Sequence, residues 1–168
     1  MFSQTSEYAV RAVIEIATRE PGASVLSSEL ATALNIPHHY LPKILKQLVR
    51  TRVLKSVRGR GGGFSLARTP KAIKLYDVVE PYEDMQKYDD CILGQPVCSD
   101  AGACPLHDFW SEVRQRYINE LKSRTLEDLQ QFHLKALAVE KPRQRNRAGS
   151  PPGKRTARTK ANKKSAGA

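Results

Sequence analysis

The chain has 168 residues and a formal net charge of +11, with 40% hydrophobic and 27% charged residues. This length suffices for one domain with a hydrophobic core and an appendage. The sequence contains no run of about 18 apolar residues, which excludes a transmembrane helix, and Met1–Val10 lacks the basic start and apolar core of a secretory signal. We therefore expect a cytoplasmic protein without membrane contact, in which thiols stay reduced.

The charge is distributed unevenly along the chain. Residues 141–168 contain ten Lys or Arg and no acid, whereas residues 1–140 contain 18 basic and 17 acidic residues. Within that nearly neutral part, residues 30–76 carry ten Lys or Arg and no Asp or Glu, and acids outnumber bases over residues 77–140. We expect one strongly positive lobe and one negative lobe.

Three helices followed by a hairpin are predicted in the first part of the chain. Apolar residues recur at intervals of three and four over 6–19, which indicates an amphipathic helix. A short second helix begins near Ser27 or Ser28, both suitable N-caps, and a third covers about 38–51, with Pro42 in its first turn. This order is typical of a helix-turn-helix.

Two short strands follow the third helix. Residues 53–58 and 64–67 alternate apolar with polar or basic side chains. Between them lies the run Gly59-Arg60-Gly61-Gly62-Gly63, and glycine tolerates the positive φ that a tight hairpin tip requires. Three helices followed by a basic hairpin predict a winged helix-turn-helix.

The remainder of the chain is predicted to hold a loop and further helices. A short helix is expected over 75–82, a cysteine-containing loop over 86–104, and a long helix from about Pro105 to Ser123. A second helix restarts at Thr125 with a cap-like pattern. From Lys141 onward no apolar periodicity remains, and disorder is predicted.

Side chains suited to DNA gather around the third predicted helix. The major groove of B-DNA admits one α-helix, and side chains near its start read base edges. Phosphates bind to basic side chains and helix N-termini, and an arginine gains from the negative potential of a narrow minor groove. The predicted DNA-binding residues are Ser28, His38, His39, Tyr40, Lys43, Lys46, Arg50, Arg58 and Arg60.

The alternative is an ordinary surface helix with solvated lysines, and for His38 and His39 a plain role at a helix start. The acid-free stretch and the glycine–arginine hairpin favour DNA binding. The glycine run is no match for a nucleotide-binding loop, because it lacks Gly-x-x-x-x-Gly-Lys and lies between strands.

The three cysteines of the chain, Cys91, Cys98 and Cys104, stand within 14 residues, and His107 follows three residues later. Thiolates hold iron–sulfur clusters, and a histidine or carboxylate can replace one of them. The spacing of Cys104 and His107 at the start of a helix lets both point at one centre. The residues therefore favour an iron–sulfur cluster, either 2Fe-2S or 4Fe-4S.

Three alternatives to a cluster stay open. Structural zinc sites use cysteine pairs two to four residues apart, which this sequence lacks. A disulfide leaves one of three cysteines unpaired and is opposed by a reducing compartment. Buried cysteines acting as small hydrophobes are disfavoured by the polar residues of the loop, and His107 by itself is also compatible with a surface hydrogen bond.

These motifs resemble the Rrf-type family of winged-helix transcriptional regulators, which includes the IscR-like and NsrR-like iron–sulfur regulators. The resemblance covers about residues 1–135. The residues that carry it are the segments Ser6-Glu7-Tyr8-Ala9-Val10-Arg11 and Tyr40-Leu41-Pro42-Lys43-Ile44-Leu45-Lys46-Gln47-Leu48, the wing from Arg58 to Ala67, and the three cysteines.

The resemblance implies a homodimer joined by the long helix around Trp110 and Tyr117. It also implies cluster ligation by the three cysteines, with a fourth ligand that differs within the family. His107 matches the position of the IscR-like histidine. Glu7 matches the position where NsrR-like proteins use an aspartate that reaches across from the partner subunit. Both candidates are therefore kept.

We predict a mainly α protein with four parts. A winged helix-turn-helix domain with a small β-hairpin wing covers residues 1–85, and a cluster-binding loop covers 86–104. Dimerisation helices, among them one long C-terminal helix, cover 105–140, and a disordered basic tail covers 141–168. The tail either adds non-specific DNA affinity through counterion release or is a solubilising extension.

The hypothesis is that the chain is a DNA-binding transcriptional regulator that acts as a repressor. It binds a symmetric operator as a homodimer. It is not an enzyme, and no small-molecule substrate is expected. The cluster would set the angle between the long helix and the winged domain, so that redox change, nitric oxide or cluster loss alters DNA affinity. One alternative is a winged-helix regulator whose cysteines sense thiols or hold zinc, and a remote one is an iron–sulfur redox protein.

Overall fold

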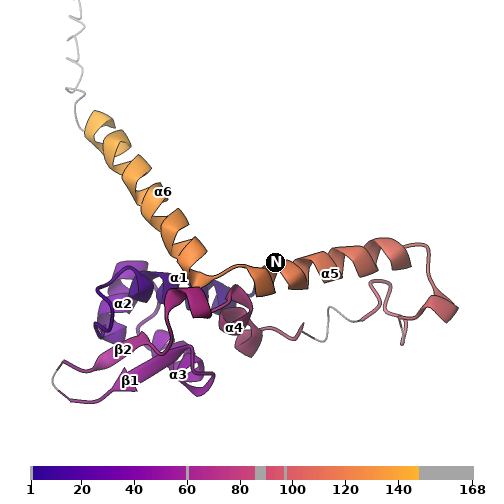
Figure 1. Cartoon of the computed structure of the whole chain (residues 1–168), viewed down its shortest axis with the longest axis horizontal. Helices are drawn as coiled ribbons and strands as arrows, with labels where there is room; N and C mark the ends of the chain where they lie inside the picture. Colours follow the sequence, from indigo (N-terminus) through magenta and orange to yellow (C-terminus); the bar gives the residue numbers. More distant parts are fainter. Residues whose placement is uncertain (1, 60, 86–89, 97, 148–168) are drawn as a thin grey trace, which may run out of the picture.

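The computed structural model describes residues 2–59, 61–85, 90–96 and 98–147, and for 140–147 it gives the helical backbone only. Figure 1 shows a body of helices with a two-stranded hairpin, from which two long helices project in different directions. In these described ranges no helix combines the length and apolarity that a membrane span requires. The prediction of a mainly α winged-helix fold is confirmed.

Three helices open the body: α1 (Gln4–Ala17), α2 (Ser27–Leu34) and α3 (Leu41–Arg50). The start of α1 is fixed by Ser3, whose hydroxyl accepts a hydrogen bond from the backbone N–H of Ser6. All three helices pack on one another. Their predicted existence and order are confirmed, and the boundaries differ by a few residues.

The structure corrects the predicted cap of α2, which begins at Ser27 as predicted, and the predicted start of α3. The N-cap of α2 is Leu26, and no side chain caps it, so neither Ser27 nor Ser28 acts as the cap. Helix α3 begins at Leu41 rather than at His38, because the chain first makes a turn after Pro37. Pro42 lies in the first turn of α3, as expected, where its missing N–H leaves no helical hydrogen bond unmade.

The wing is an antiparallel hairpin of β1 (Leu54–Val57) and β2 (Gly63–Leu66), followed by a short 3-10 turn, η1 (Pro70–Ala72). Val25, which precedes α2, forms an isolated β-bridge to Phe64 of β2. The wing is therefore tied to the helices through backbone hydrogen bonds.

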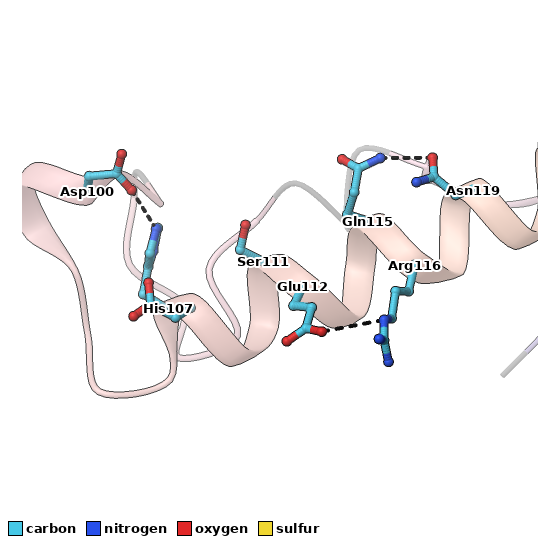
Figure 2. A pocket seen from close by; sticks show the side chains of 8 residues that line it. Asp100, His107, Ser111, Glu112, Gln115, Arg116 and Asn119 are labelled. Carbon is cyan, nitrogen blue, oxygen red and sulfur yellow. Dashed lines mark hydrogen bonds and ion pairs between the residues drawn. The ribbon is translucent and has the colours of Figure 1, made fainter.

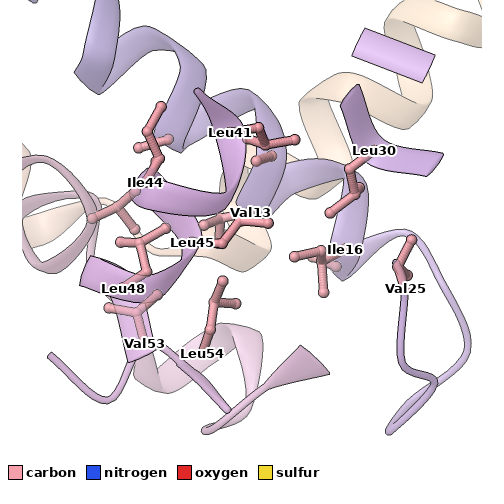
Figure 3. Packing of buried hydrophobic residues seen from close by; sticks show 14 of the residues in the cluster. Val13, Ile16, Val25, Leu30, Leu41, Ile44, Leu45, Leu48, Val53 and Leu54 are labelled. Atoms are coloured by element: carbon pink, nitrogen blue, oxygen red, sulfur yellow. The ribbon is translucent and has the colours of Figure 1, made fainter. Parts of the chain in front are cut away.

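One hydrophobic core joins the helices to the hairpin (Figure 3). Each helix buries one face, as the periodicity of its apolar residues predicts. Burial of large aliphatic side chains supplies the main favourable free energy of such a fold. The fully buried members with the largest side chains include Leu30, Leu41, Leu45, Leu48, Leu54, Ile73 and Leu126.

After the wing, the chain leaves the body and returns to it. Short helix α4 (Leu75–Val79) and 3-10 turn η2 (Glu80–Tyr82) precede the cysteine loop, which contains the 3-10 turn η4 (Asp100–Gly102). The long helix α5 (His107–Ser123) then runs back towards the body, and α6 (Leu126–Arg147) projects away from it (Figure 1). Helix α4 packs against both α1 and α5.

Helix α6 extends past Lys141, the residue from which disorder was predicted, as far as Arg147. The prediction was based on the loss of apolar periodicity, but Lys, Arg and Gln favour helical backbone without an apolar face. The rest of the predicted tail, 148–168, lies outside the described residues.

The start of α6 is capped as the cap-like pattern predicted. Thr125 caps α6 together with Asp128, whose carboxylate accepts the Thr125 N–H at 2.8 Å.

Candidate DNA interface and cysteine site

The polar side of α3 presents three basic residues to solvent. Lys43, Lys46 and Arg50 are all exposed, and their spacing of three and four residues places them on one face of the helix. The guanidinium of Arg50 donates to the side-chain oxygen of Gln47 at 3.3 Å. The opposite face enters the core through Leu41, Ile44, Leu45 and Leu48.

The turn before α3 carries the predicted base-reading residues. The N–H of Tyr40 donates to the carbonyl of Pro37 at 3.0 Å, which closes the turn. His38 and His39 are exposed in it, and His38 Nε2 lies 3.4 Å from the hydroxyl of Thr32 on α2. Both histidines therefore lie next to the start of α3, outside the helix itself.

Tyr40 occupies a different environment from the two histidines. Its hydroxyl lies 2.6 Å from the Thr5 hydroxyl on α1, and its ring meets the ring of Tyr8 edge-on at 6.2 Å between centroids. The ring also packs against the core. These contacts hold the Tyr40 side chain against α1, and its DNA contact stays a prediction.

The wing and the second helix contribute the remaining predicted DNA contacts. Ser28 is exposed in the first turn of α2, and Arg58 is exposed directly after β1. Arg60 lies outside the described residues. At the hairpin tip Gly59 has a φ of +95°, and a Cβ on Gly62 would lie 2.4 Å from the carbonyl oxygen of Val57. The tip therefore requires glycine at both positions.

The cysteine loop lies at the far end of α5 from the body (Figure 1). Within one chain, the cysteines therefore lie away from the DNA-reading elements. Helix α5 separates the two, because its first residue, His107, belongs to the loop end and its last, Ser123, to the body end. Within one chain, α5 connects the loop to the body.

Three free thiols meet in this loop. Cys91 is buried, and Cys98 and Cys104 are half-buried. The backbone N–H groups of Gln95 and Leu93, and then the thiols of Cys104 and Cys98, donate to the Cys91 sulfur and hold the pKa of Cys91 below its usual value. Burial, followed by the charge of Cys91, raises the pKa of Cys98.

His107 stands beside these thiols at the start of α5. Its Nδ1 lies 3.4 Å from the sulfur of Cys98, and its Nε2 lies 3.0 Å from a carboxylate oxygen of Asp100. The ring is only 8% exposed. Asp100 therefore fixes the orientation of the imidazole, an arrangement common behind metal-ligating histidines.

A polar groove of about 440 Å³ runs from this histidine along α5 (Figure 2). The carboxylate of Glu112 pairs with Arg116 at 3.4 Å on its floor, and the amide of Gln115 donates to Asn119 at 2.9 Å. These pairs satisfy one another, and the buried His107 lines the groove together with Asp100.

Trp110 binds the loop from the helix side. Its indole N–H donates to the carbonyl of Asp90 at 2.9 Å, directly before Cys91 in the chain. Neither this bond nor the role of Asp100 was predicted. The sequence indicates Asp100 as a candidate, because it is an acidic residue inside the loop, seven positions before His107. No sequence pattern indicates that Trp110 bonds to the carbonyl of Asp90.

The donors are neighbours, but they do not yet surround one metal position. In the part of the chain that the structure describes, no three His, Cys, Asp or Glu side chains are placed to hold a metal ion together. After the backbone at Gln95 and Leu93, the thiols of Cys104 and Cys98 lower the pKa of Cys91. Metal binding requires the thiol protons to leave. The soft donor set fits a thiolate-ligated centre by its chemistry.

The second predicted fourth ligand, Glu7, lies elsewhere. It is exposed in the first turn of α1, on the body, while the loop is at the remote end of α5 (Figure 1). Of the two candidates, only His107 adjoins a cysteine within the chain.

Comparison with known proteins gives this geometry its context. Residues 2–131 match the family model Rrf2, described as an iron-dependent transcriptional regulator. The chain belongs to the Rrf2 family. A protein of Aquifex aeolicus (strain VF5) named as an HTH-type transcriptional regulator is 34% identical over 131 residues, which are 77% of this chain and 90% of that protein. A Mycobacterium tuberculosis (strain ATCC 25618 / H37Rv) protein with a similar name is 35% identical over 128 residues, 76% and 79% of the two chains.

Solved structures of Rrf2 relatives share the fold. CymR, the global cysteine regulator of B. subtilis, is 27% identical with a TM-score of 0.65, and the match covers 79% of this chain and 97% of CymR. IscR of T. potens is 26% identical with a TM-score of 0.64, with 81% and 90% covered. The predicted family is confirmed, and this Rrf2 protein is a DNA-binding transcriptional regulator, not an enzyme.

Proposed function

We propose that this Rrf2 protein is a homodimeric repressor whose affinity for a two-fold symmetric operator depends on an iron–sulfur cluster held by Cys91, Cys98 and Cys104. The observation that carries the proposal is the meeting of three thiols at the end of the helix that leads to a winged helix-turn-helix. Thiolates are the usual ligands of such clusters. The iron-dependent description of the family supports it, and the cluster is either 2Fe-2S or 4Fe-4S.

The fourth ligand in this proposal is His107. It lies beside Cys98 and is oriented by Asp100. Because Glu7 is remote from the loop within one chain, it would have to come from a second subunit. A His107→Ala protein that keeps its full iron content would favour Glu7.

DNA is bound through α3 and the wing. We propose that α3 enters the major groove with Lys43, Lys46 and Arg50 on its polar face, and that Arg58 and Arg60 follow the adjacent minor groove. A dimer of helix-turn-helix domains reads two half-sites that are spaced by one helical turn or a multiple of it. His38, His39 and Ser28 then lie at the edge of the contact.

An iron–sulfur cluster, when bound, supplies a centre whose charge and ligand set respond to oxidation, nitric oxide and iron loss. The protein contributes a loop that is attached to α5 by the bond between Trp110 and Asp90 and by the buried Cys91. When the cysteines change between the free thiol form and the cluster-bound form, the loop has to pack differently against α5. For this change to regulate transcription, the two forms of the protein must differ in DNA affinity.

The proposal is tested on protein purified without air. We expect visible absorbance and matching amounts of iron and acid-labile sulfide in the wild-type protein, both lost in Cys98→Ala and retained in the neighbouring control Ser99→Ala. Binding is measured to a duplex that the wild-type protein selects from a random-sequence library. Colourless, iron-free wild-type protein, or unchanged DNA affinity in Cys98→Ala, would contradict the proposed switch.

A second candidate is a cluster-free thiol sensor. It is favoured by the close approach of the thiols and the lowered pKa of Cys91, because the thiolate is the reactive form of cysteine. Zinc is a further alternative for the same ligands. Zinc, iron and sulfide analysis of the same sample separates the three, since a thiol sensor contains none of them and changes intact mass on oxidation.

A cytoplasmic location, where thiols stay reduced, is part of the proposal. The basic residues beyond 148 are proposed to add non-specific DNA affinity. Removal of 148–168 is then expected to weaken binding to unrelated duplexes and to lower its salt dependence, while the preference for the selected duplex stays.

A further inference from the structure

The junction between the long helix and the DNA-reading body contains a short segment that bonds to two distant elements. Helix α4 packs between α1 and α5, and η2 continues directly from α4. Beside this junction, the ring of Phe2 lies 6.4 Å from the ring of Tyr117 on α5. A displacement of α5 therefore has to be accommodated by α4, by η2 and by the start of α1.

Tyr82, the last residue of η2, reaches the proposed recognition helix. Its hydroxyl donates to the carbonyl oxygen of Ile44 at 2.7 Å, and Ile44 is only 2% exposed in the middle of α3. The Tyr82 ring packs against the core. Burial, and then the nearby Tyr40, raises the pKa of Tyr82, so its hydroxyl stays a donor at ordinary pH.

Glu83, the next residue, reaches the start of α1. Its carboxylate accepts the backbone N–H of Ser3 at 2.8 Å, and Ser3 is the N-cap of α1. Two consecutive residues thus attach the same segment to α3 on one side and to α1 on the other. Neither contact is part of the predicted DNA interface or of the cysteine site.

We propose that Tyr82 and Glu83 form a two-point tether that passes a displacement of α5 to α3, and that Tyr82 is a positioning residue for DNA binding. This inference rests on the proposed function, which supplies the displacement at the cysteine loop. The tether works because a hydroxyl bonded to the backbone carbonyl of a residue on the buried side of α3 cannot shift far without moving that helix or losing the bond. A partner at the end of an exposed side chain would not have this effect.

The alternative is a purely structural hydrogen bond, and a ratio of affinities distinguishes the two. Full-length protein is prepared with iron and without it, and each form is titrated with the duplex that the wild-type protein selects. In Tyr82→Phe, which keeps the ring and removes the hydroxyl, we expect the ratio between the two affinities to shrink by roughly three- to tenfold, the range of one hydrogen bond. A structural role would weaken both forms equally and leave the ratio unchanged.

Tyr76→Phe is the matched control, because Tyr76 lies on α4 next to Lys122 of α5 and not against α3. Its ratio should stay that of the wild type. Hydrogen exchange on the iron-free protein gives a readout without DNA: we expect faster exchange of α3 amides in Tyr82→Phe, with α2 unchanged.

The outcomes separate the tether from the proposed function. If the wild-type DNA affinities with and without iron are equal, both the proposed function and the tether are contradicted. If the two affinities differ and Tyr82→Phe keeps the wild-type ratio, only the tether is contradicted. Should Tyr82→Phe fail to fold, Glu83→Gln takes its place, and a wild-type ratio in that variant would overturn the tether.

Discussion

At the scale of single residues, close approach of the backbone and side-chain charge determine which residue types a position tolerates. Gly63 has a φ of +145°, and a Cβ there would lie 2.5 Å from the carbonyl oxygen of Val25. This glycine allows the wing to pair with the segment before α2. Glu83 plays a comparable part by charge, since its carboxylate meets the donors at the start of α1.

Glu83→Gln is expected to lower the free energy of unfolding by about 1 kcal/mol near neutral pH, because the helix start loses a charged acceptor. Burial alone would raise the pKa of Glu83, but hydrogen bonds from Ser6 and Ser3 outweigh it and hold the pKa below that of an ordinary glutamate. A lowered folded-state pKa stabilises the protein above the unfolded-state value, and this contribution is lost as the pH falls.

The difference between wild type and Glu83→Gln should therefore shrink towards zero between about pH 5 and about pH 3, where the carboxylate takes up its proton. Urea unfolding across this range measures it. Glu112→Gln, whose partner Arg116 is solvent-exposed, is the control and should change stability little. A difference for Glu83→Gln that persists unchanged into acid would show that charge is not the cause.

At the scale of elements, α3 divides its surface between two tasks. One face is buried by four aliphatic residues, and the other carries Lys43, Lys46 and Arg50 in solvent. No acidic side chain occurs in the sequence from residue 30 to residue 76, so α3 itself carries basic side chains and no acidic ones. Such a face attracts the phosphates of DNA of any base sequence. It adds sequence specificity only through the side chains that reach bases.

Lys46→Ala is expected to weaken binding to the selected duplex several-fold and to reduce the slope of log affinity against log salt by about one, as for the loss of one phosphate contact. Fluorescence anisotropy at several salt concentrations measures both. Lys135→Ala removes the same charge from an exposed position on the projecting helix α6 and serves as control. Equal losses in the two variants would mean that net charge alone, and not the α3 surface, controls binding.

At the scale of the whole molecule, α5 holds the cysteine loop away from the body and leaves apolar side chains uncovered. Phe109 is 60% exposed and Val113 is 39% exposed, on a helix that touches the body mainly at its C-terminal end (Figure 1). An uncovered apolar stripe of this kind is typical of an association surface. It supports the proposed homodimer, in which two such helices would cover one another.

Val113→Asp should convert the dimer into a monomer, because an aspartate placed in an apolar interface has to be desolvated without a partner. Sedimentation equilibrium over a range of protein concentrations measures the association. Gln115→Glu adds the same charge on the polar side of α5, beside the groove of Figure 2, and should stay dimeric. A dimer of wild-type strength in Val113→Asp would place the interface elsewhere.

The sequence by itself determined the elements and the chemistry available to them. The periodicity of apolar residues predicts α1, α3 and α5, the pairing of Thr125 with Asp128 predicts the start of α6, and the glycine run predicts the wing tip. These signals are local: each depends on residues within a few positions, whose backbone angles and shared helical faces decide the outcome. The three thiols and His107 were likewise visible as a donor set.

Only the tertiary structure decided how distant residues meet. It turned Tyr40 onto Thr5, joined Tyr82 to Ile44, and placed the cysteine loop at the end of α5 away from the body. None of these contacts is written in a local pattern, because each exists only when several elements pack at once around one core. The spacing of residues in the sequence determines which groups each element offers. The simultaneous packing of the helices determines which of these groups come into contact.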